Sequence, residues 1–178
     1  MPGTTHDPVH RTSYEFMPEG ENLVVETWLE PGGGLPPHEH PRQEERWYVI
    51  DGKVEFRLGK QKRVIGPEDG EMVVPPNTVH ALKAVQDTTA HLGCRATPAL
   101  GLQGFLEESA AAARAGLFMK GGIPKSLKGA RWAAEFLDRY GDDVVMTFPP
   151  RFAQNAMKAL FGGKSAGAAS ATMEGDAH

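Results

Sequence analysis

A chain of 178 residues favours a single domain with an appendage, and its 40% apolar fraction suffices for a packed core. The net charge of −4 and the scattered 19 Lys and Arg residues argue against a nucleic-acid partner. No apolar run reaches the roughly 18 residues that span a bilayer, and the N-terminus lacks the basic and then apolar segments of a signal peptide. The single Cys94 cannot form an internal disulfide, so we expect a cytoplasmic protein without a membrane partner.

The first part of the chain reads as β-structure. Residues 1–11 are polar and show no periodicity, which predicts a flexible arm. Beyond them, short segments are rich in β-branched and aromatic residues or alternate apolar with polar ones, as strands do. These segments are 22–30, 46–50, 53–58, 61–65, 71–75, 79–85 and 88–96.

Turn signals lie between the segments. Asp51-Gly52 is a typical hairpin turn, and Gly59-Lys60 offers the next one. Many short strands with turns at intervals of roughly 8–12 residues are typical of a sandwich or barrel. The sequence therefore predicts a β-barrel over residues 12–98.

The composition changes after Pro98, and the predicted extension covers residues 99–161. Apolar residues recur there at helical spacing, which predicts three helices. These helices are expected at 102–118, 125–140 and 151–161. Residues 162–178 are small and polar and cannot bury enough apolar surface to offset their ordering entropy, so we predict a disordered tail.

The segment before the second predicted strand contains a candidate metal site. If the chain there is extended, His38 and His40 point to the same face. A four-residue connection then brings Glu45 back opposite them, and His80 is available as a fourth ligand. Three imidazoles and one carboxylate suit a divalent Fe, Mn, Co, Ni, Cu or Zn ion. An octahedral ion would keep two open positions, whereas a tetrahedral Zn site would be closed and structural.

Glu44 competes with Glu45 for the ligand role, because a shift of one residue moves a strand side chain to the opposite face. If Glu45 faces inward, Trp47 and Val49 face inward with it. If Glu44 faces inward, Arg46 lies inside the barrel, which is less favourable for a core.

Three apolar residues are candidates for the wall of a substrate pocket. Trp47 and Val49 would lie below the metal on the face of Glu45, and Leu82 shares the face of His80. The alternative is that all three only fill the core.

The chain resembles the cupin superfamily at two motifs. The first is usually written G-x5-H-x-H-x3,4-E-x6-G, and it is matched by Gly32, His38, His40, Glu45 and Gly52. This match also selects Glu45 over Glu44. The resemblance covers about residues 20–96.

The second motif is usually written G-x5-P-x-G-x2-H-x3-N and is matched with departures. Gly70, Pro75 and His80 are present, although Gly70 is one residue closer to the proline. Asn77 replaces the glycine, which is tolerable because asparagine can adopt a positive φ. Ala84 replaces the final asparagine. The departures affect turn geometry more than metal binding, because the ligand histidine is kept.

The resemblance implies a mainly β fold, a single antiparallel jelly-roll barrel with a C-terminal α-helical extension. It also implies one divalent metal ion bound inside one mouth by His38, His40, Glu45 and His80, and a homodimer. Two alternatives remain open for the helices. They cover a sheet face or a dimer contact, or one of them closes the barrel mouth and shapes the pocket.

Three functional hypotheses follow. The favoured one is a metal-dependent enzyme that acts on a small organic molecule, either oxygenase-like or a redox-silent isomerase or lyase. The second is a small-ligand-binding or sensor protein without turnover. A storage or structural barrel is the third. No group of cations lies near the motifs to bind a phosphate, which favours an apolar substrate of modest charge.

Overall fold

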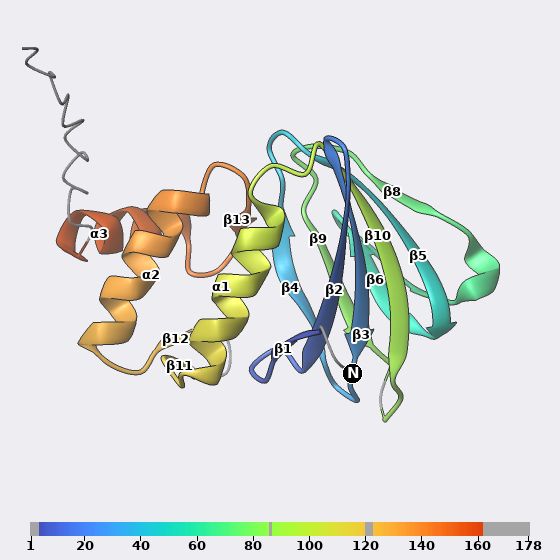
Figure 1. The fold of residues 1–178 in the computed structure, drawn as a ribbon, viewed down its shortest axis with the longest axis horizontal. Helices are drawn as coiled ribbons and strands as arrows, with labels where there is room; N and C mark the ends of the chain where they lie inside the picture. The colour runs from blue at the N-terminus through green and yellow to red at the C-terminus, as the bar shows by residue number, and fades with distance from the viewer. Residues whose placement is uncertain (1–3, 86, 120–122, 162–178) are drawn as a thin grey trace, which may run out of the picture.

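The computed structural model describes residues 4–85, 87–119 and 123–161, and in it three helices lie to one side of two antiparallel sheets (Figure 1). The six-stranded sheet has the order β1 (Thr5–Asp7), β2 (Thr12–Glu19), β3 (Asn22–Leu29), β10 (Ala90–Thr97), β5 (Glu44–Gly52) and β8 (Met72–Val74). The five-stranded sheet has the order β13 (Val145–Met146), β4 (Gly34–Glu39), β9 (His80–Ala84), β6 (Val54–Leu58) and β7 (Gln61–Ile65).

The smaller elements lie in the connections. A short 3-10 helix, η1 (Pro67–Asp69), precedes β8, and β11 (Phe118–Met119) pairs with β12 (Ile123–Pro124). The helices of the extension are α1 (Leu102–Arg114), α2 (Leu127–Tyr140) and α3 (Arg151–Phe161). Within the described residues, no helix is both long and apolar enough to cross a membrane.

The mainly β, antiparallel fold with C-terminal helices is confirmed, and each of the seven predicted segments contains a strand. The two-residue turn at Gly59-Lys60 is also confirmed, since Leu58 pairs with Gln61 across it. Inward side chains of both sheets form one core, because alternate residues of a half-buried strand point to the same face. This core includes Leu23, Val25, Leu29, Val54, Phe56, Leu82, Ala84 and Leu92.

The predicted hairpin at Asp51-Gly52 is wrong. Gly52 belongs to β5 and lies opposite Ala90 of β10, whereas β6 pairs with β7 and β9 of the other sheet. The chain therefore passes from one sheet to the other after Gly52, which has a φ of 78°. An Asp-Gly pair indicates where a chain bends, but the partner strand is chosen by side chains far away in sequence.

The predicted flexible arm is also wrong where it is described. Residues Thr5–Asp7 form β1 and pair with β2, and Asp7 is only 2% exposed. Helix α1 packs against β1, and the Arg114 guanidinium donates to the carbonyl oxygen of His6. A three-residue strand is too short for a periodicity signal, and contacts with a helix about a hundred residues later add to its pairing with β2. Residues 1–3 and the predicted disordered tail at 162–178 lie outside the described residues.

The helices begin and end close to the predicted positions. Helix α1 ends at Arg114, four residues before the predicted 118, because Gly116 adopts a φ of 67°. The backbone N–H of Gly116 donates to Ala113, and that of Leu117 donates to Ala112, the pattern of a Schellman C-terminus. Ser126 caps α2 through its hydroxyl oxygen.

Aromatic side chains hold α1 against α2. The ring of Phe105 in α1 lies 4.9 Å from that of Phe136, which stacks on Trp132 at 4.5 Å. Tyr140 donates its hydroxyl hydrogen to Glu108 of α1 at 2.8 Å. Such pairs contribute beyond their buried area, so the helices form a packed layer of their own.

The extension returns to the barrel after α2. Strand β13 adds to the edge of the five-stranded sheet, with Val145 opposite Glu39 and Met146 opposite His38. Strand β13 is therefore hydrogen-bonded to the strand that carries a predicted metal ligand. This pairing fixes the position of the extension relative to the candidate site.

We expect Gly34→Ala to destabilise the fold. An added Cβ would lie 2.3 Å from the carbonyl oxygen of Leu82 and 2.9 Å from the Cα of Lys83, so β4 and β9 would have to separate. The expected loss is about 1–3 kcal/mol of unfolding free energy, measured by urea denaturation. Gly66→Ala is the control, because the three atoms nearest to its added Cβ all belong to the flexible side chain of Glu68. Equal losses in the two variants would contradict this account of β4.

Candidate metal centre

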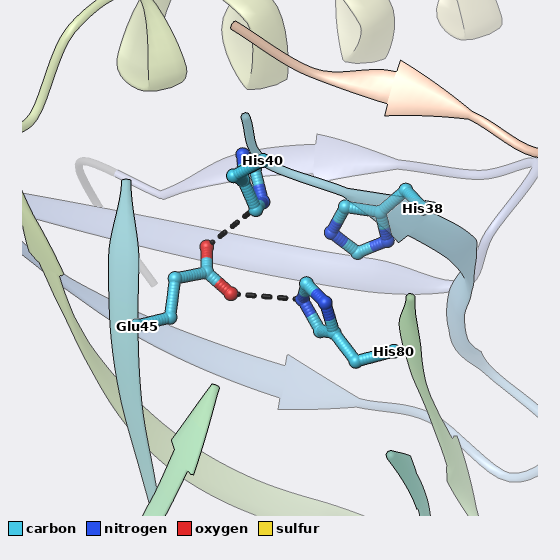
Figure 2. Close-up of side chains that lie close together, drawn as sticks. All are labelled: His38, His40, Glu45 and His80. Atoms are coloured by element: carbon cyan, nitrogen blue, oxygen red, sulfur yellow. Dashed lines mark ion pairs between the residues drawn. The ribbon is translucent and has the colours of Figure 1, made fainter. Parts of the chain in front are cut away.

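Four side chains meet inside one end of the barrel (Figure 2). His38 comes from β4, His40 follows the end of that strand, Glu45 comes from β5 and His80 from β9. One potential ligand atom from each lies within 4.8 Å of the others. All four are buried, with His38 the most exposed at 8%. The structure thus brings the predicted ligand set together.

The choice between the two glutamates follows the alternation of β5. Glu45 is 2% exposed, and Trp47 and Val49 are buried on the same face. Glu44 lies on the other face, where it accepts a hydrogen bond from Arg46 at 2.8 Å. Glu45 is therefore the carboxylate that faces the histidines, and no arginine of this strand enters the core.

Backbone carbonyl groups fix the orientation of all three imidazoles. The Nδ1 atom of His38 lies 2.7 Å from the carbonyl oxygen of Pro36. The Nδ1 atom of His40 lies 3.0 Å from the carbonyl oxygen of Asp143, and the Nδ1 atom of His80 lies 3.1 Å from the carbonyl oxygen of Thr78. A carbonyl oxygen can only accept, so each Nδ1 carries a hydrogen. In the neutral rings, each Nε2 then keeps a free lone pair, as a metal-binding histidine requires.

The Glu45 carboxylate faces two of these nitrogens. Its Oε1 lies 3.1 Å from Nε2 of His40, and its Oε2 lies 2.9 Å from Nε2 of His80 (Figure 2). Both Nε2 atoms are buried, and neither has a partner with hydrogen-bond geometry among the described residues. Lone pairs and a carboxylate repel one another at these distances. A positive charge, from protons on the imidazoles or from a metal ion, is needed to hold the group together.

Burial and these contacts shift the pKa values of Glu45, His38 and His40. Burial raises the pKa of Glu45, but His40 and His80 outweigh it and hold the pKa well below its usual range. Burial lowers the pKa of His38, and His80 and His40 lower it further. Burial also lowers the pKa of His40, but the neighbouring Glu45 carboxylate outweighs this and raises it. At neutral pH Glu45 is ionised and His38 is neutral, the states in which each binds a metal.

Trp47 positions the carboxylate. Its indole Nε1 donates to Oε2 of Glu45 at 2.8 Å. The sequence interpretation gave Trp47 only a pocket or core role and missed this contact. The signal was present, because residues two apart on a strand share a face and an inward tryptophan needs an acceptor.

Asp143 is a site residue that the sequence interpretation missed completely. Its carbonyl oxygen accepts from His40, although 103 residues separate the two. Its carboxylate accepts from the guanidinium of Arg42 at 2.5 Å and from the backbone N–H of Gly101 at 3.2 Å. One residue thus joins the loop after β4, the start of α1 and the end of α2. No local pattern predicts such a contact, because it depends on how the extension folds back.

A cavity of about 610 Å³ adjoins the site. His38 and Glu45 line it, as do Trp47 and Leu82, two of the three predicted pocket residues. The third, Val49, is not among the lining residues and packs in the core opposite Leu92. Val49 lies two residues beyond Trp47 on the same inner face of β5, so it is further than Trp47 from the Glu45 end of the strand.

The helical extension supplies much of the cavity wall. Its lining side chains are mostly apolar and include Leu102, Phe105, Leu106, Trp132, Phe136 and Met157. All three helices contribute to this set. The extension therefore lines the cavity, as the second alternative expects, while α1 also packs against β1 at the edge of the six-stranded sheet.

Comparisons with known proteins agree with this architecture. Residues 25–94 match the family model of the cupin domain. An oxidoreductase of Arthrobotrys oligospora is 38% identical over 55 residues, which are 30% of this chain and 22% of that protein. The mannose-1-phosphate guanylyltransferase RfbM of Salmonella typhimurium is 30% identical over 81 residues, 44% of this chain and 17% of that protein. This chain therefore matches less than a quarter of the length of either relative.

A crystal structure of an RmlC-like cupin from Shewanella frigidimarina has a TM-score of 0.47 and 22% identity, over 53% of this chain and 83% of that one. The family match spans strands β3 to β10, the part of the barrel that contains the four clustered residues. Residues 25–94 therefore match a cupin domain, and helices α1, α2 and α3 follow this segment as a C-terminal extension.

Proposed function

We propose that His38, His40, Glu45 and His80 bind one divalent transition metal ion. One observation carries the proposal: three imidazoles with hydrogen-bonded Nδ1 atoms and one ionised carboxylate converge in a buried space. A cation is the simplest group that satisfies all four at once. Nitrogen and oxygen donors of this kind suit Fe, Mn, Co, Ni, Cu or Zn, and availability decides among them.

We further propose that the protein is an oxygenase-like enzyme acting on a small organic molecule. The cavity beside the candidate ligands has the volume of a small-molecule site, and apolar side chains form most of its wall. A redox-active ion would supply electron transfer between O₂ and a substrate, whereas a redox-silent ion would polarise a carbonyl group. The match to a fungal oxidoreductase adds only slight support, because it covers 22% of that protein.

The residues around the candidate ligands have defined roles in this proposal. His38 and Glu45 line the cavity, so the proposed metal position lies at the wall of the substrate space. Trp47 orients the carboxylate by its indole N–H, and the carbonyl of Asp143 orients His40. The apolar helix residues exclude water from the cavity, which strengthens every electrostatic interaction inside it.

The homodimer and the cytoplasmic location stay predictions. The apolar side chains of Tyr48, Ile50 and Val73 are 36%, 41% and 37% exposed on the outer face of β5 and β8. Exposed apolar groups on one sheet face support the prediction of a second copy as partner.

Purified protein that has never met a chelator is expected to contain one transition metal ion per chain by elemental analysis. Loss of a residue that hydrogen-bonds to a metal ligand lowers metal affinity roughly 10- to 100-fold. His40→Ala removes a proposed ligand itself, so metal affinity should fall by more than that. Its circular dichroism spectrum should stay native. His91→Ala is the matched control, because His91 contacts Glu26 away from the site. A His40→Ala protein that keeps its metal would contradict the ligand assignment.

Oxygen uptake separates the proposed enzyme from its alternatives. We expect the metal-loaded protein to consume O₂ with at least one member of a panel of small phenols, diketones and acids, measured with an oxygen electrode. The His40→Ala protein is the control for uptake by free metal. Conversion of a panel member without O₂ uptake would instead indicate a redox-silent isomerase or lyase. Binding without any conversion would indicate a ligand-binding protein.

Asp143→Ala tests whether the extension supports the metal centre. The change removes the acceptors of Arg42 and Gly101, so the carbonyl that orients His40 loses its fixed position. Metal affinity should fall by roughly 10-fold in a competition titration with a chelator. Asp142→Ala, at the exposed neighbouring position, should leave the affinity unchanged. Equal affinities in the two variants would show that the extension does not position His40.

A further inference from the structure

The cavity has a second polar region far from the candidate ligands. Ala96 of β10 lies opposite both Leu23 of β3 and Glu45 of β5, so these three share one level of the barrel. Thr27 lies four residues further along β3 and points to the same inner face. At roughly 3.3 Å per residue, it stands about 13 Å from the level of Glu45. Both Thr27 and Glu45 line the same cavity.

The Thr27 hydroxyl is buried without a partner. The residue is 1% exposed, and its Oγ1 makes no hydrogen bond within the described residues. Only three other buried side-chain atoms there share this state, and two of them are Nε2 of His40 and Nε2 of His80. An unpaired buried hydroxyl is unfavourable unless a bound group satisfies it. Thr27 therefore marks a ligand position, as the unpaired imidazole nitrogens do at the metal centre.

An aspartate and a histidine lie at the same end of the cavity. Asp7 pairs with Thr12 in the sheet, two residues beyond the level of Thr27. Its Oδ1 accepts from the backbone N–H groups of Val9 and His10, which shape the turn. Its Oδ2 accepts from Nδ1 of His10 at 2.8 Å. Turn formation explains the first two contacts but not the third, which fixes the imidazole at the cavity wall.

The charge of this pair restricts what it can bind. Burial raises the pKa of Asp7, but the contacts with His10 outweigh it and leave the pKa below its ordinary value. The carboxylate is therefore ionised at neutral pH and repels a carboxylate or phosphate ligand. With Nδ1 of His10 directed at Asp7, Nε2 is the ring nitrogen that remains for a ligand in the cavity. A ligand hydroxyl matches this nitrogen in either protonation state, because a hydroxyl can both donate and accept a hydrogen bond.

We propose that Thr27 and the Asp7–His10 pair form a second subsite, which binds a hydroxyl group at the far end of an elongated, mainly apolar substrate. The inference rests on the proposed function, because it places the reacting end of that substrate at the metal centre. Apolar side chains between the two ends, such as Val25 and Leu82, contact the body of the molecule. The substrate class is thus an alkyl or aryl compound with hydroxyl character at the end remote from the reaction.

Two probes with the same number of carbon atoms test the subsite. The first is a ten-carbon straight-chain diol with one hydroxyl at each end, and the second is decanol. Isothermal titration of the full-length, metal-loaded protein should show a roughly 3- to 10-fold preference for the diol, the effect of one added hydrogen bond. Thr27→Val keeps the shape of the side chain and should abolish the preference. Thr97→Val, at an exposed position of β10, should retain it.

His10→Leu is the second variant, and it should also reduce the preference if Thr27→Val fails to fold. A wild-type protein that binds metal but does not prefer the diol would overturn the subsite, and so would a folded Thr27→Val protein that keeps the preference. The same titrations without added metal separate the two proposals. A diol preference in a protein that binds no metal would support the subsite while contradicting the proposed function.

Discussion

The buried Glu45 carboxylate is the constraint on which the rest of the site depends. Removing a carboxylate from water is costly unless positive charge and hydrogen bonds replace the lost hydration. Trp47 supplies one hydrogen bond, and two imidazole nitrogens lie within 3.1 Å of the carboxylate oxygens. Because backbone carbonyls fix the Nδ1 hydrogens of those rings, the charge has to come from added protons or from a metal ion. Side chains of β5 alternate between its two faces, and this alternation directs Glu45 inward. The need for a compensating positive charge therefore follows from the position of Glu45 in the strand.

The extension belongs to the site as much as the barrel does. His40 lies just past the end of β4, where no barrel strand holds it, and its Nδ1 contacts the carbonyl of Asp143. The position of Asp143 depends in turn on the start of α1 and on the pairing of β13 with β4. Helix packing is thereby coupled to ligand geometry. Side chains of the same helices line the cavity, so one structural layer both contacts His40 and forms part of the cavity wall.

Local patterns predicted the parts of this structure that short-range physics decides. The inward face of β5 and the turn at Gly59 follow from alternation and from backbone preference. The turn at Asp51 was assigned to the wrong pairing, because a bend does not identify its partner strand. Strand β1 is too short for a periodic pattern, and Asp143 depends on a contact across 103 residues, which no single segment predicts. Motif resemblance supplied the ligand set, but not the hydrogen bonds behind it.

Unpaired buried polar atoms show how the cavity divides its chemistry. Among the described residues, the Nε2 atoms of His40 and His80 next to one end of the cavity lack hydrogen-bond partners, and the hydroxyl of Thr27 at the other end lacks one. Apolar side chains line the cavity between the two ends. The first end carries an ionised carboxylate and needs a cation, whereas the neutral Thr27 hydroxyl at the other end is matched by a neutral polar group. A ligand that satisfies both ends has to be long, apolar in the middle and polar at its tips. Its orientation is then fixed, because only one tip can meet a metal ion.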